Sequence, residues 1–145
     1  GAMWAGIAIL WLAPHLSGYA PRADLVEFNL GRLAEERGDR AEAAAHYDRT
    51  LAADPNNLSA TLNLGTLAAR AGDYTTARAR FARAVELAPD SDDAHANLGA
   101  ALLALGDLSA AERELDRALD LNPENRFAQH NREILRRRIA LPALP

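Results

Sequence analysis

A repeat of 34 residues is the feature that most constrains how this chain can fold. Three consecutive segments, residues 24–57, 58–91 and 92–125, carry similar residue types at the same offsets. A unit of this length holds two short helices, and neither can bury its apolar face within a single unit. Stacking of successive units completes the core, so the spacing predicts an all-α solenoid.

Two glycine positions recur in each unit and serve different purposes. One follows a leucine inside the first helix, where glycine costs about 1 kcal/mol of helix propensity, which indicates the close approach of a neighbouring helix. This position holds Gly31, Gly65 and Gly99. The other glycine ends the first helix and precedes an aspartate that can cap the second helix. That position holds Gly38, Gly72 and Gly106.

The second helix of each unit carries a small residue four positions before a larger one, so both lie on one helix face. The pairs are Ala43 with Tyr47, Ala77 with Phe81, and Ala111 with Leu115. We expect them to form a small-to-large fit against the first helix. A proline then marks the join between units, because proline cannot continue a helix interior. It recurs at Pro55, Pro89 and Pro123.

These motifs resemble the tetratricopeptide repeat family over residues 24–125. The resemblance implies a right-handed superhelical solenoid of antiparallel helix pairs. The chain departs from the family pattern at two aromatic positions, which hold Glu27, Thr61 and His95 and then Ala34, Ala68 and Leu102. These departures reduce the aromatic packing between helices but keep the small residues that the fold requires.

Residues 126–139 predict one more amphipathic helix with no second helix after it. The last repeat of a solenoid needs a cap over its apolar face. The residues expected to pack there are Phe127, Ile134, Leu135 and Ile139. Three arginines at 136–138 suit a helix C-terminus, although a patch for an anionic membrane or nucleic acid is the alternative. Residues 140–145 form a proline-containing tail.

The N-terminal residues 4–20 are of a different kind. Residues 1–3 resemble the remnant of a cleaved purification tag. From Met3 to Ala13 the chain is almost continuously apolar, and Pro14 closes the stretch. The residues Tyr19, Ala20 and Pro21 keep the 34-residue register, so the segment enters the first repeat as an ordinary join.

Three interpretations of this apolar segment remain open. It is shorter than the roughly 20 residues that span a bilayer, so upstream of Pro14 it could be the end of a transmembrane helix and a membrane attachment. It could instead be a helix that packs over the first repeat. It could also dock in the groove of its own or a neighbouring molecule, which would make the protein a homo-oligomer.

A row of asparagines points to the concave face, which the first helices of such a solenoid form. They are Asn29, Asn63, Asn97 and Asn131, each one repeat apart. An amide can both donate to and accept from a peptide group, so the row predicts binding of a polypeptide backbone. It resembles the asparagine ladder of O-linked N-acetylglucosamine transferases. The alternative is a structural role in hydrogen bonds between adjacent helices.

The residues around this row predict a mainly apolar trough for an extended or helical peptide. They are Phe28, Arg32, Leu62, Thr66, Arg70, Ala96, Ala100 and Leu103. Chaperone-tail binders of the family hold a terminal carboxylate with Lys, Asn, Asn, Lys and Arg. The matching positions here are Phe28, Arg32, Asn63, Asp93 and Asn97. Only Asn63 agrees and Asp93 would repel a carboxylate, so this type of clamp is not expected.

Composition excludes several kinds of chemistry. The net charge of −4 gives no reason to expect nucleic acid as a partner. The chain has no cysteine, which excludes disulfides and thiolate sites. Its four histidines lack the spacing of metal ligands, and His46 is expected on the surface of a second helix. Because no catalytic motif or cofactor loop is present either, we expect no metal, no cofactor and no enzymatic activity.

The sequence therefore predicts a protein–protein interaction module that binds a peptide segment of a partner in its concave groove. One alternative is a non-catalytic regulatory or targeting domain of a larger membrane-bound enzyme such as a glycosyltransferase. The other alternative is self-association through the apolar N-terminal segment.

Overall fold

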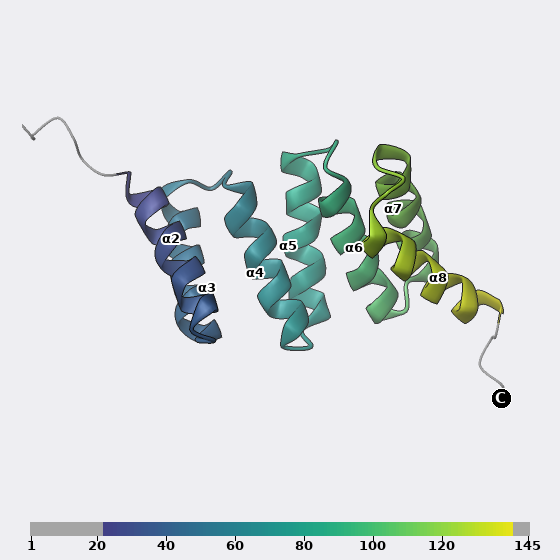
Figure 1. The fold of residues 1–145 in the computed structure, drawn as a ribbon, viewed down its shortest axis with the longest axis horizontal. Helices are drawn as coiled ribbons and strands as arrows, with labels where there is room; N and C mark the ends of the chain where they lie inside the picture. The colour runs from purple at the N-terminus through teal and green to yellow at the C-terminus, as the bar shows by residue number, and fades with distance from the viewer. Residues whose placement is uncertain (1–21, 141–145) are drawn as a thin grey trace, which may run out of the picture.

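A computed structural model of the protein describes residues 22–140. Within that range the chain is helical and contains no strand. Six helices form three antiparallel pairs and a seventh follows them (Figure 1). Their bounds are α2 Ala23–Glu36, α3 Arg40–Ala53, α4 Leu58–Arg70, α5 Tyr74–Leu87, α6 Asp92–Leu105, α7 Leu108–Leu121 and α8 Arg126–Ala140. The predictions for residues 1–3, the apolar segment 4–20 and the tail beyond residue 140 lie outside the described residues.

The turn inside each pair has the conformation that its sequence predicts. The three turn glycines adopt left-handed φ angles of 80° to 84°, which cost a residue with a side chain more than they cost glycine. The following aspartates then accept a hydrogen bond from a backbone N–H in the first turn of the second helix. These aspartates are Asp39, Asp73 and Asp107. The predicted helix stop and helix cap are confirmed.

The glycine inside each first helix lies against the large residue of the second helix. A Cβ atom on Gly31 would lie 2.6 Å from Tyr47 Cε1, and one on Gly65 would lie 2.5 Å from Phe81 Cε1. At Gly99 the nearest atom would be Leu115 Cγ at 2.7 Å. Because these separations are shorter than van der Waals contact, only glycine allows the two helices of a pair to pack this closely. The predicted close approach is confirmed.

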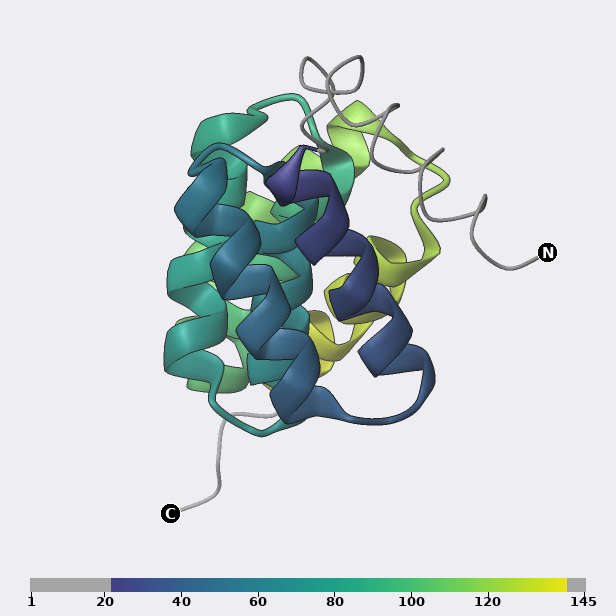
Figure 2. The ribbon, with the colours of Figure 1, turned by 90° about the vertical axis from the view of Figure 1, so that its left-hand side faces the viewer.

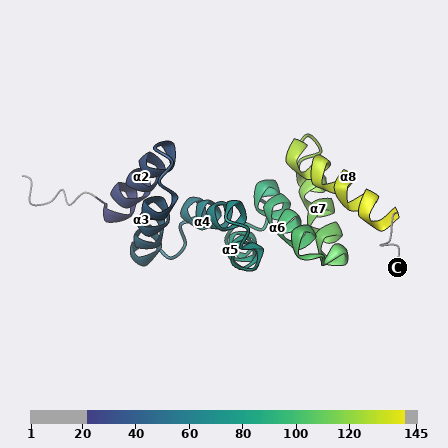
Figure 3. The ribbon, with the colours of Figure 1, turned by 90° about the horizontal axis from the view of Figure 1, so that it is seen from below.

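The pairs stack side by side into an elongated molecule (Figures 1 and 3). Seen along the long axis, the first helix α2 and the last helix α8 lie on the same side of the stack (Figure 2). The buried apolar residues form two clusters. One joins repeat 1 to α4 and is centred on Tyr47 and Leu64. The other joins repeats 2 and 3 to α8 and includes Phe81, Leu115 and Leu135.

Helix α8 packs on α6 and α7, but the expected packing residues are only partly correct. Leu135 is fully buried in the second cluster. Phe127, Ile134 and Ile139 are instead 39–50% exposed. The inward face of α8 uses the small side chains of Ala128 and Asn131 together with Leu135, so the larger residues on either side remain open to solvent.

The expected surface position of His46 is wrong. Its side chain is only 12% exposed and its Nδ1 lies 2.7 Å from Glu27 Oε2 across the repeat 1 pair. The family's first aromatic position is occupied by Glu27 here, and the carboxylate draws the imidazole inward. No helix between residues 22 and 140 is both long and apolar enough to cross a membrane. The same residues contain no cluster of three potential metal ligands.

Candidate functional site

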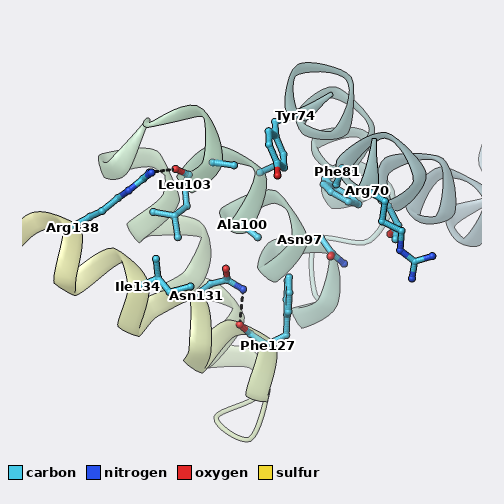
Figure 4. A pocket seen from close by; sticks show the side chains of 14 residues that line it. Arg70, Tyr74, Phe81, Asn97, Ala100, Leu103, Phe127, Asn131, Ile134 and Arg138 are labelled. Atoms are coloured by element: carbon cyan, nitrogen blue, oxygen red, sulfur yellow. Dashed lines mark hydrogen bonds between the residues drawn. The ribbon is translucent and has the colours of Figure 1, made fainter. Parts of the chain in front are cut away.

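A groove crosses the face formed by the first helices of repeats 2 and 3 and by α8 (Figure 4). It encloses about 590 Å³, within the usual size range of ligand pockets. We call it the α4–α8 groove. Its lining residues are Thr66, Ala69 and Arg70 of α4, Tyr74 and Phe81 of α5, Asn97, Ala100, Ala101, Leu103 and Ala104 of α6, and Phe127, Asn131, Ile134 and Arg138 of α8.

The floor and walls of the α4–α8 groove are mainly apolar. Ala100, on α6, supplies a small side chain between the larger ones, which keeps the groove open (Figure 4). Tyr74, Phe127 and Ile134 line it while remaining 39–49% exposed. Large apolar side chains that are exposed around a concavity mark a surface where a ligand can bury apolar area.

The charges in the α4–α8 groove have one sign. Its lining contains Arg70 and Arg138 and no carboxylate. Nη1 of Arg138 donates a 2.7 Å hydrogen bond to the carbonyl oxygen of Leu103, in the last turn of α6, where the helix dipole favours a cation. Arg70 is more exposed and lies 3.5 Å from Glu35 of repeat 1.

The asparagine row divides between three environments. Asn97 and Asn131 line the α4–α8 groove, and the Nδ2 atom of each donates to the carbonyl oxygen four residues earlier in its own helix, at 2.9 and 2.8 Å. This bond leaves Oδ1 as an acceptor. Asn63 lines a different hollow beside Tyr47, and Asn29 is exposed and lines neither.

A second hollow of about 560 Å³ lies between repeat 1 and α4. Its lining is Phe28, Arg32, Glu35, Glu36, Ser59, Leu62 and Asn63. Oε2 of Glu35 accepts a 2.6 Å hydrogen bond from the Tyr47 hydroxyl. Burial of the phenol, and then the Glu35 carboxylate, raise the pKa of Tyr47 above its ordinary value, while Asn63 acts in the opposite direction. Two carboxylates distinguish this hollow from the α4–α8 groove.

The predicted groove residues therefore separate into two groups. Six line the α4–α8 groove: Thr66, Arg70, Asn97, Ala100, Leu103 and Asn131. Four line the second hollow: Phe28, Arg32, Leu62 and Asn63. Ala96 was placed in the trough wrongly, because it is fully buried in the cluster that joins repeats 2 and 3. Leu103 is 4% exposed and reaches the groove with one edge.

Sequence reasoning missed four groove residues, Tyr74, Phe127, Ile134 and Arg138. The repeat contains the signal for two of them. Ile134 and Arg138 lie 34 residues after Ala100 and Ala104, which are themselves groove residues. Extending the register of the asparagines to their neighbours in α8 would have identified these two positions.

Comparison with known proteins gives consistent results at the level of sequence models. Two models described as tetratricopeptide repeat match residues 28–92 and 68–131, which together span residues 28–131. The comparison with curated proteins gives no match.

Solved structures of similar fold include several such domains. The first tetratricopeptide domain of Spaghetti (RPAP3), bound to the HSP90 peptide SRMEEVD, has a TM-score of 0.78 at 26% identity, covering 83% of this chain and 96% of that one. MamA has a TM-score of 0.76 at 26% identity, covering 81% and 64%. An O-GlcNAc transferase mutant of Thermobaculum terrenum has a TM-score of 0.71 at 28% identity, covering 78% of this chain and only 22% of that one.

Proposed function

The chain belongs to the tetratricopeptide repeat family, and from that premise we propose that it is a protein-interaction module whose α4–α8 groove binds a peptide segment of a partner. Domains of this family are generally non-catalytic interaction modules. The similar domain of Spaghetti was solved with a peptide bound. The observation that carries the proposal is an open, mainly apolar groove with two amide side chains along its floor.

Affinity would come from apolar side chains of the peptide. Tyr74, Phe127 and Ile134 present exposed apolar area around the groove, and burial of such area contributes about 25 cal/mol per Å² before the costs of association are subtracted. A helical peptide with residues at i, i+3 and i+4, or an extended one with alternate residues, would fill the space left by the alanines of α6.

The asparagines would fix the peptide backbone. In both Asn97 and Asn131, one N–H of the amide is bound to the helix carbonyl, which holds the side chain in place. The Oδ1 atom can accept from a peptide N–H and the second N–H can donate to a peptide carbonyl. Because these bonds involve main-chain atoms, they contribute affinity for many sequences, and the apolar contacts determine which sequence binds best.

A chaperone tail is not the ligand that we propose, despite the peptide in the Spaghetti complex. Of the five clamp positions only Asn63 matches, and it lies in the second hollow. Oδ1 of Asp93, at another clamp position, accepts a 3.2 Å hydrogen bond from Asn125. Its negative charge would oppose a terminal carboxylate.

The test begins with peptides selected from a random display library on the full chain. Affinities of the selected peptides are then compared between Ala100→Arg, which fills the groove, and Ala45→Arg, which adds the same side chain to an exposed site on α3. We expect loss of binding only with Ala100→Arg, with both variants folded by circular dichroism. Equal affinities for the two variants would reject the groove as the binding surface.

A second candidate function is a regulatory or targeting domain within a larger enzyme. It is favoured by the similarity to the O-GlcNAc transferase, of which this chain covers only 22%. In that case the groove would select protein substrates or a membrane partner for a catalytic domain elsewhere. The sequence of the complete gene discriminates, because a catalytic domain joined to these repeats would support this role and its absence would reject it.

A further inference from the structure

The outer face of α2 carries apolar residues that repeats 2 and 3 bury at the equivalent positions. Val26, Leu30 and Leu33 are 40–47% exposed. One repeat later the same positions hold Ala60, Leu64 and Leu67, which are at most 7% exposed. In repeat 3 they hold Ala94, Leu98 and Ala101, which are at most 8% exposed. The face of α2 thus has the sequence of a covered surface.

The second helix of the preceding repeat provides the cover in the later repeats. Ala44 and Leu51 of α3 pack against the cluster that contains Leu64 and Leu67. In the next junction Ala82 and Val85 of α5 pack in the same way against the cluster that contains Leu98. An element that covers α2 would therefore occupy the place of a second helix, one repeat before α3.

We propose that the chain's own apolar segment, residues 6–13, covers this face of α2. The 34-residue register places these residues at the first two turns of a second helix, residues 40–47. Pro21 lies 34 residues before Pro55, so the join has the usual length. Pro14 would end the helix after two turns, because proline removes a backbone donor and clashes with the preceding turn.

The register also states which side chains meet. Ile7 and Leu10 correspond to Ala41 and Ala44. Those alanines line a cavity of about 380 Å³ together with Leu64 and Leu67, so Ile7 and Leu10 would lie against Leu30 and Leu33. The larger side chains would fill the space that the alanines leave open. Trp11 corresponds to Ala45, which is exposed, and would point away from α2.

The test uses the full chain, which has no cysteine of its own. Leu30→Cys gives a single thiol on the proposed covered face. Leu105→Cys gives a reference thiol on α6, because Leu105 is 41% exposed against 40% for Leu30 in the described structure. Reaction with a maleimide is followed by mass. We expect Leu30→Cys to react about tenfold or more slowly than Leu105→Cys, since a covered site must first open.

Two further substitutions show what provides the cover. Added to Leu30→Cys, Ile7→Asp with Leu10→Asp should restore fast labelling, whereas Trp11→Asp should not. Equal labelling of the two single thiols would overturn the proposal. So would protection that increases with protein concentration, which would place the segment of a second copy on α2, or protection seen only with lipid vesicles present.

A direct cross-link provides an independent measurement that does not depend on labelling rates. Leu10→Cys with Leu33→Cys should oxidise to an intramolecular disulfide in the monomer, while Trp11→Cys with Leu33→Cys should not. Disulfide-linked dimers in place of the intramolecular bond would assign the contact to two molecules. Peptide binding in the α4–α8 groove is measured separately, so failure of this proposal leaves the proposed function untouched.

Discussion

His95 on α6 and Glu114 on α7 face one another, with 2.7 Å between Nδ1 and Oε2. Two repeats earlier the same positions hold Glu27 and His46, again 2.7 Å apart, so the two residue types are exchanged while the contact is kept. The Nε2 atom of His95 lies 2.9 Å from the carbonyl oxygen of Pro89. Carboxylate and carbonyl both accept, so both ring nitrogens of His95 donate.

This exchange between repeats predicts that the pair in repeat 3 can be reversed. His95→Glu alone places two carboxylates together and should lower the free energy of unfolding by about 1–3 kcal/mol. Adding Glu114→His should recover most of that loss, but not the part that comes from the bond to Pro89. Urea unfolding of the two variants and the parent at pH 7 measures the effect. A double variant no more stable than His95→Glu would show that the positions act independently.

Gly65 tests the close packing within a pair. Gly65→Ala gains about 1 kcal/mol of helix propensity, but the new Cβ would lie 2.5 Å from Phe81 Cε1. Overpacking of this kind costs roughly 1–3 kcal/mol, so we expect a net loss of stability in thermal or urea unfolding. Ser59→Ala, at an exposed site on the same helix, is the control and should have little effect. A stabilised Gly65→Ala variant would contradict the proposed reason for the glycine.

Asp92 predicts a dependence of stability on acid. Its Oδ2 atom accepts 2.8 Å hydrogen bonds from Asn122 and Asn125, and these two amides hold the pKa of Asp92 below its ordinary value. A lowered folded-state pKa contributes stability above the unfolded-state pKa, and this contribution is lost as the pH falls through the folded-state value.

The corresponding experiment compares wild type with Asp92→Asn in urea at pH 7 and at pH values down to about 2. We expect wild type to be the more stable protein at pH 7 and the difference to shrink as acid protonates Asp92. A difference that stays constant over this range would show that the charge of Asp92 contributes nothing.

Two adjacent arginines on α8 should differ in their contributions. Arg138 donates to the Leu103 carbonyl, while Arg137 pairs with Glu133 at the exposed surface. Arg138→Met should lower stability by about 1 kcal/mol and speed amide hydrogen exchange in the last turn of α8. Arg137→Met should change little, because exposed ion pairs contribute at most about 1 kcal/mol. Equal effects of the two substitutions would reject the role assigned to Arg138.

Phe127 and Ile139 provide a matched pair for the binding surface. Both are on α8 and about half exposed, at 49% and 50%, but only Phe127 lines the α4–α8 groove. Phe127→Ser should weaken binding of a selected peptide by about tenfold or more, as loss of an aromatic contact in an interface does. Ile139→Ser should leave the affinity unchanged, and both variants should unfold at temperatures close to the parent. Isothermal titration calorimetry supplies the affinities.

The limits of prediction are clearest on α8. Its helical character followed from the sequence, but the side chains expected to pack did not all pack. An apolar residue near the end of a solenoid can serve the core or a groove, and the choice depends on how far the helix leans against its neighbours. Phe127 and Ile134 illustrate this, since the buried contacts of α8 are made by Ala128, Asn131 and Leu135.

The sequence by itself determined the features that depend on a few neighbouring residues. Left-handed turns at Gly38, Gly72 and Gly106, the aspartate caps and the glycine contacts all follow from local backbone preferences and from the 34-residue period. Tertiary structure decided which residues meet across helices and between repeats. The contact of His95 with Glu114, the division of the asparagines between two hollows and the exposure of Phe127 depend on the stacking of the pairs, which no short stretch of sequence encodes.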